Sequence, residues 1–127
     1  MISRTKILVV DDDSEIVEMI TLMLETAGYE IISADSGDTC LSILERERPD
    51  LILLDVMMET MTEGFHVGYK IKNSSEYKSI PIIFMSSISK KTGFPIDTDF
   101  INGNVFLEKP INPDELLERI KNILEVF

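Results

Sequence analysis

The chain has 127 residues, the size of one ordinary domain, and its 44% hydrophobic and 28% charged residues are typical of a globular protein rather than a disordered one. Its formal net charge is −11, from 12 Lys and Arg against 23 Asp and Glu, which argues against a protein that binds nucleic acid or inserts into an anionic membrane. A single cysteine excludes an internal disulfide, and no apolar run has the length of a membrane span or the pattern of a signal peptide, so we expect a cytoplasmic protein.

Strands and helices alternate along the predicted elements. Apolar runs that do not alternate with polar residues predict strands covered on both faces, and apolar stripes at helical spacing predict helices. In chain order, these patterns place a strand at residues 7–10, a helix at 15–27, a less regular strand at 30–33, a helix at 38–46, a strand at 51–54, a helix at 63–73, strands at 82–85 and 105–107, and a helix at 113–127. This order predicts an α/β fold with a parallel sheet between helices, as one domain over residues 1–127.

Local signals mark the helix ends. Gly28 follows the first helix as a stop signal, and Asn112 before Pro113 is typical of a helix start. Residues 89–100 stand where a fourth helix belongs, between the last two strands, but they contain a glycine and a proline and lack helical spacing. We therefore predict a short or irregular fourth helix there.

Polar side chains stand at the carboxyl ends of four predicted strands. Parallel strands end at one edge of a sheet, where ligands bind in open α/β folds, so we expect these side chains to converge. The set comprises Asp11, Asp12, Asp13, Asp55, Ser86, Ser87 and Lys109. Asp13 directly precedes the first helix, and we expect it to cap that helix rather than to join the cluster.

Such a cluster favours a divalent cation and a phosphoryl group. Neighbouring carboxylates repel one another unless a cation lies among them, and oxygen-rich sites with open positions suit Mg²⁺. Asp55 is then the candidate nucleophile, forming an aspartyl phosphate. Lys109 and the Ser86 hydroxyl are the candidates to bind the phosphoryl oxygens, where negative charge gathers during transfer.

Several short segments, in a fixed order, carry a resemblance to a known family. They are residues 6–13 (KILVVDDD), 37–41 (GDTCL), 48–58 (RPDLILLDVMM), 64–65 (GF), 80–86 (IPIIFMS) and 106–110 (FLEKP). With these segments the chain resembles the receiver domain of two-component response regulators over residues 6–127. The resemblance implies a flavodoxin-like, doubly wound, five-stranded parallel sheet with strand order 2-1-3-4-5.

The resemblance also implies the residues that bind the metal and the phosphoryl group. Asp55 matches the phosphoacceptor. Asp11 and Asp12 match the acidic pair that holds Mg²⁺, with Asp12 the more direct ligand, and Met57 matches the position whose backbone carbonyl completes the metal site. Lys109 matches the family's invariant lysine.

Two further residues are implied to transmit the phosphorylated state. Ser86 matches a hydroxyl that reorients toward the phosphate, and Phe106 matches an aromatic switch that turns inward when the hydroxyl moves. The implied donor is a sensor histidine kinase or a phosphotransfer protein, and the output protein is not identified by the sequence. Such a receiver is not a conventional enzyme, although it assists its own phosphorylation and dephosphorylation.

Two other functions remain open at this stage. A receiver fold that binds partners without phosphorylation is one. Residues 58–64 form a loop that lacks the family's proline and is one residue longer, and residues 89–100 are irregular. The other is a phosphatase of the haloacid-dehalogenase type, whose Asp-x-Asp signature fits residues 11–13. That family places its nucleophile after the first strand, so the labelled aspartate distinguishes it from a receiver.

Overall fold

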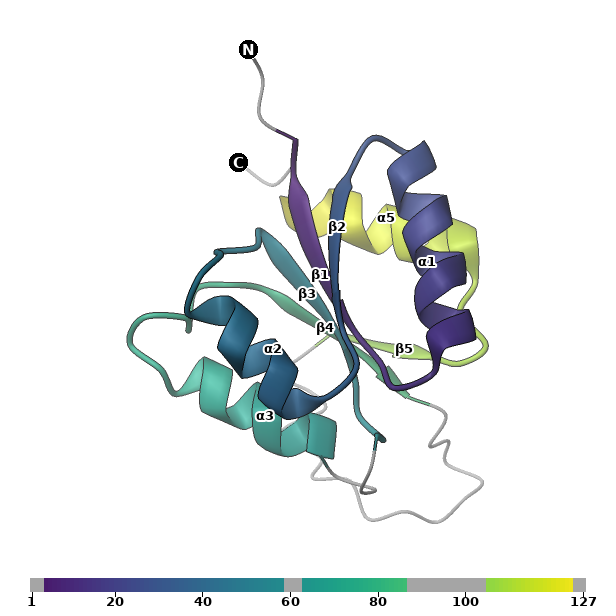
Figure 1. The fold of residues 1–127 in the computed structure, drawn as a ribbon. Helices are drawn as coiled ribbons and strands as arrows, with labels where there is room; N and C mark the ends of the chain where they lie inside the picture. The colour runs from purple at the N-terminus through teal and green to yellow at the C-terminus, as the bar shows by residue number, and fades with distance from the viewer. Residues whose placement is uncertain (1–3, 59–62, 87–104, 125–127) are drawn as a thin grey trace.

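The computed structural model describes residues 4–58, 63–86 and 105–124. Five parallel strands form one sheet in the order β2-β1-β3-β4-β5, with helices on both faces (Figure 1). In chain order the elements are β1 (Lys6–Val10), α1 (Ser14–Thr26), β2 (Glu30–Ala34), α2 (Gly37–Leu44), β3 (Leu51–Asp55), α3 (Glu63–Lys72), β4 (Ile82–Ser86), β5 (Val105–Glu108) and α5 (Pro113–Leu124). The predicted fold class and strand order are confirmed, and the predicted irregular fourth helix lies outside the described residues.

The two faces of the sheet carry separate cores. Helices α1 and α5 cover one face, and α2 and α3 cover the other (Figure 1). Alternate residues of β3 point to opposite faces, so Ile52 and Leu54 pack with α2 and α3, whereas Leu51 and Leu53 pack with α1 and α5. Both faces therefore need apolar residues, which explains why the strands read as continuous apolar runs.

Side chains and one glycine fix the predicted helix ends. The Asp13 carboxylate accepts the backbone N–H of Glu15 at 3.0 Å, which makes it the N-cap of α1. Asn112 does the same for α5, accepting the N–H of Glu115 at 3.0 Å. Gly28 follows α1 with φ 101°, a conformation that favours glycine. No helix in the described parts of the chain is long and apolar enough to cross a membrane.

Gly64 brings the start of α3 against the end of β3. Its N–H donates to the carbonyl oxygen of Val56 at 2.8 Å, and a Cβ at this position would overlap the carbonyl oxygen of Asp55. We expect Gly64→Ala to lower the free energy of unfolding by about 3 kcal/mol, because backbone rather than a flexible side chain would have to move.

Urea denaturation of the two proteins measures this cost. Gly28→Ala is the matched control: nothing lies within 4 Å of the added methyl group, and only the positive φ opposes it, at a cost of about 1 kcal/mol. A Gly64→Ala protein as stable as the Gly28→Ala protein would contradict the close approach of α3 to β3.

Candidate functional site

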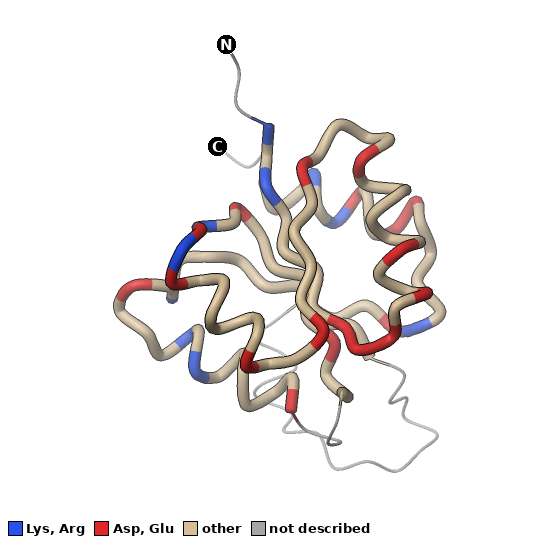
Figure 2. The backbone as a smooth tube through the Cα atoms, viewed as in Figure 1, with Lys and Arg blue, Asp and Glu red and all other residues tan. Residues whose placement is uncertain are grey.

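The sheet itself gathers the candidate residues at its carboxyl edge. Asp55 is the last residue of β3 and Ser86 the last residue of β4, while Asp11 directly follows β1. These three strands are neighbours in the sheet. The backbone N–H of Lys109 donates to the carbonyl oxygen of Ser86 at 2.8 Å, which brings the end of β5 to the same edge. Acidic residues are prominent along this edge in Figure 2.

Three carboxylates meet there. Asp11, Asp12 and Asp55 each offer an oxygen, and these oxygens lie within 4.8 Å of one another. Asp11 and Asp55 are buried, with 1% and 2% of their surface exposed, whereas Asp12 is exposed. The convergence predicted from the strand ends is therefore observed for these three aspartates, and Asp13 points instead to the α1 amides.

Lys109 lies between the two buried carboxylates. Its Nζ is 2.8 Å from Oδ2 of Asp11 and 3.3 Å from Oδ1 of Asp55. Burial lowers the pKa of Lys109, but hydrogen bonds to the two aspartates and their charges outweigh it, so the pKa is raised and the side chain stays charged. The ammonium thus compensates carboxylates that would otherwise be buried without a counter-charge.

The hydrogen bonds of Asp11 and Asp12 differ although the residues are adjacent. Asp11 accepts the N–H of Asp13 at 3.0 Å with Oδ1 and the Lys109 ammonium with Oδ2. No hydrogen bond or ion pair to the Asp12 carboxylate occurs among the residues that the structure describes. Asp12 therefore has oxygens available for a ligand from solvent, while both oxygens of Asp11 are engaged by the protein.

Asp55 has an unusual electrostatic environment. Burial and the negative charge of Asp11 raise its pKa to about 7, against the opposing effects of Lys109 and of the Met57 N–H, which donates to Oδ1 at 3.3 Å. A carboxylate in this position gains from any cation that enters the site. Carboxylate oxygens such as those of Asp12 and Asp55 are donors that suit Mg²⁺.

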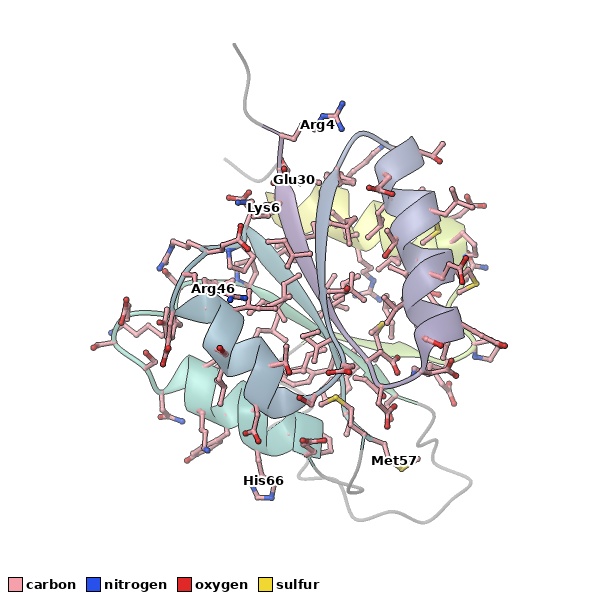
Figure 3. The ribbon with its side chains drawn as sticks, in the orientation of Figure 1. Arg4, Lys6, Glu30, Arg46, Met57 and His66 are labelled. Atoms are coloured by element: carbon pink, nitrogen blue, oxygen red, sulfur yellow. The ribbon has the colours of Figure 1, made fainter. Side chains whose placement is uncertain are left out.

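Met57 lies beyond the end of β3, at the edge of the sheet opposite to Arg4 and Lys6 (Figure 3). Lys6 pairs with Glu30 and Glu47 at that other edge, at 3.6 and 3.4 Å. Residues 59–62 of the atypical loop lie outside the described residues.

Three phenylalanine rings lie beside the site, a grouping that the sequence analysis missed. The phenylalanine cluster consists of Phe65 from α3, Phe84 from β4 and Phe106 from β5. The rings of Phe84 and Phe106 stack with centroids 5.1 Å apart, and Phe65 lies 6.2 Å from Phe84 and 6.1 Å from Phe106. Gly68 was the sequence signal for this close packing. Glycine lowers helix propensity, so its position inside α3 calls for another explanation.

Comparison with known proteins identifies the family. The family model of the response regulator receiver domain matches residues 7–121. The probable transcriptional regulator ycf27 of Porphyridium aerugineum is 34% identical over 122 residues, which is 95% of this chain and 48% of that protein. Among solved structures, a putative response regulator from Chloroflexus aurantiacus is 32% identical with a TM-score of 0.82, covering 98% of this chain and 100% of the other.

A third match shares the fold at lower identity. The receiver domain of the sensor histidine kinase PA1611 from Pseudomonas aeruginosa, solved with a magnesium ion coordinated in its active-site cleft, is 22% identical with a TM-score of 0.81, covering 98% of this chain and 100% of the other.

The α/β fold, the acidic edge and the family match together identify a signalling domain. The chain belongs to the response regulator receiver domain family of two-component signalling. It spans about half the length of the curated relatives it matches, such as 48% of the ycf27 protein.

Proposed function

We propose that the chain is a single receiver domain over residues 1–127 that accepts a phosphoryl group on Asp55 and changes its partner binding in response. The observation that carries this proposal is the ion pairing of Lys109 with the buried carboxylates of Asp11 and Asp55. Oxygens of these two carboxylates also lie within 4.8 Å of an oxygen of the exposed Asp12. A purely structural ion pair would not need a third, solvent-facing carboxylate at the same point. The arrangement instead suits a site that admits a cation and an anion together.

Mg²⁺ is the proposed cofactor. Asp12, Asp55 and the backbone carbonyl of Met57 would hold the ion, and Asp11 would support it from the buried side. When bound, Mg²⁺ supplies positive charge that neutralises the carboxylates and the phosphoryl oxygens. The magnesium ion held by the PA1611 receiver domain supports this choice for a site of the same fold.

The proposed reaction is transfer from a phosphohistidine of a sensor kinase or phosphotransfer protein. An Asp55 carboxylate oxygen attacks phosphorus, the P–N bond to the donor imidazole breaks, and the leaving imidazole takes up a proton. The Lys109 ammonium, already in place, stabilises the charge that develops on the phosphoryl oxygens. Ser86, buried at the end of β4, is the proposed hydroxyl that binds the product phosphate.

The proposed output is a shift between two arrangements of the domain. Binding of the phosphate by Ser86 favours one position of Phe106, and a partner protein that prefers this arrangement then binds more tightly. The partner itself is not identified. The net charge of −11 and the family together favour a cytoplasmic protein partner over direct contact with nucleic acid.

Intact-mass spectrometry after incubation with acetyl phosphate and Mg²⁺ tests the proposal. We expect the wild type to gain the mass of one phosphoryl group, and expect no gain for Asp55→Asn or for the wild type in EDTA. A wild type that stays unmodified while a known receiver is labelled under the same conditions would overturn the proposal. It would leave a receiver fold that binds its partners without phosphorylation.

A further inference from the structure

The phenylalanine cluster depends on a glycine in helix α3. Gly68 lies three residues after Phe65, and a Cβ at this position would lie 2.6 Å from Cε1 and Cζ of Phe84. The Phe84 ring, fully buried, therefore occupies the space in which another residue at position 68 would place its side chain. This close packing explains the glycine in the helix. Without a side chain at position 68, the α3 backbone can lie directly against the Phe84 ring of β4.

The cluster is directly connected to the site. Phe84 and Ser86 are two residues apart in β4, so their side chains leave the same face of the sheet. Phe106 pairs with Phe84 in the β4–β5 register, and Glu108 pairs with Ser86. The stacked rings are thus one step along the ladder from the Ser86 hydroxyl.

Phe106 is held by two rings in this structure. It is half-buried and packs against the core formed with α2 and α3, stacked on Phe84 at an angle of 21° and touching Phe65 from α3. Moving the ring elsewhere would break both contacts together. Each aromatic pair adds enough attraction to change an equilibrium constant by about threefold to tenfold.

We propose that contacts with Phe65 and Phe84 already favour, before Asp55 is phosphorylated, the position of Phe106 that the phosphoryl group stabilises. The arrangement that the phosphoryl group stabilises is then already the major one in the unphosphorylated chain, and the bond from the phosphoryl group to Ser86 raises its population further. This regulation rests on the proposed function, but the position of the ring does not. The two can therefore be tested separately.

Solution NMR of the full chain with ¹³C-labelled phenylalanine rings reports the ring position. We expect nuclear Overhauser contacts from Phe106 to both Phe65 and Phe84 in the presence of Mg²⁺, without and with beryllofluoride, a mimic of the phosphoryl group. Contacts that appear only with beryllofluoride would overturn the proposal. If beryllofluoride does not bind, the proposed function fails, and the contacts in the unliganded chain still decide whether the rings hold Phe106.

Phe65→Leu tests whether the contacts matter for the site. Leucine keeps an apolar side chain at this half-buried position, so the fold is retained while the ring contact is lost. We expect weaker contacts between Phe106 and Phe84 and a loss of beryllofluoride affinity of about threefold to tenfold. Gly68→Ala, which displaces the Phe84 ring, should act in the same direction.

The control is Ile83→Val. Ile83 neighbours Phe84 in β4 but packs on the opposite face with α1 and α5. We expect this variant to keep both the ring contacts and the affinity. Equal affinities for Phe65→Leu and the wild type, or an equal loss in Ile83→Val, would overturn the proposal.

Discussion

Lys109→Ala is expected to slow phosphorylation of Asp55 by acetyl phosphate by about 100-fold, since removing one preorganised donor at the point where charge develops costs this much in related chemistry. The Nζ of Lys109 is 2.8 Å from Asp11 and 3.3 Å from Asp55, so its loss also leaves two buried carboxylates facing each other. The lysine lowers the pKa of Asp55, and without it that pKa rises above its present value of about 7. The uncompensated carboxylates and the higher pKa both disfavour the ionised form of Asp55, which is the nucleophile.

The time course of mass gain at a fixed Mg²⁺ concentration measures this rate. Lys121→Ala is the matched control, because Lys121 is an exposed lysine in the last turn of α5. It removes the same charge from the chain without touching the site and should leave the rate unchanged. Lys109→Ala with the rate of the wild type would show that the ion pair only stabilises the fold.

Asp55→Asn is expected to stabilise the metal-free chain above pH 7. The pKa of Asp55 is raised from 3.8 to about 7, chiefly by burial and by Asp11, so the folded state binds a proton that the unfolded state has lost. This contribution is fully present below the unfolded pKa of 3.8 and disappears as the pH rises through about 7. Above that pH the wild type carries two buried carboxylates, whereas the amide variant carries one.

We expect the difference between the two proteins to reach about 2 kcal/mol in favour of Asp55→Asn at pH 8 in EDTA, and to shrink toward pH 5. Urea denaturation at several pH values measures it, and Mg²⁺ at pH 8 should stabilise the wild type more than the variant. Asp38→Asn, at an exposed position in the first turn of α2, is the control, and its difference from the wild type should not follow this course. A pH-independent difference for Asp55→Asn would contradict the raised pKa.

Much of the fold was predictable because both faces of the sheet are covered. Strands such as β3 need apolar residues on both faces. The resulting apolar run at residues 51–54 therefore indicates a buried strand even when the segments that pack against it are unknown. The convergence of Asp11, Asp55 and Lys109 was predictable for a similar reason, since parallel strands must end at one edge. Caps at Asp13 and Asn112 are local and depend on the next few residues only.

Other features depend on contacts between distant segments. Asp11 and Asp12 are adjacent residues of the same type, so the sequence does not distinguish them. The path of the chain as it leaves β1 buries Asp11 against Lys109 and exposes Asp12. Gly68 reads as a weakness in α3, and its purpose becomes visible only when Phe84, sixteen positions further on (84 − 68), lies against it. Propensity describes a residue with its neighbours and carries no information on such pairings.

The measurement that tests the central claim most directly is the location of the phosphoryl group. Borohydride reduces an acyl phosphate to the alcohol with loss of phosphate, which would convert the phosphorylated residue 55 to homoserine, and peptide mass spectrometry then locates the change. After treatment with acetyl phosphate and Mg²⁺, we predict reduction at Asp55 alone. Reduction at Asp11 or Asp12 would contradict the account and indicate a nucleophile after the first strand, as in a haloacid-dehalogenase-type phosphatase.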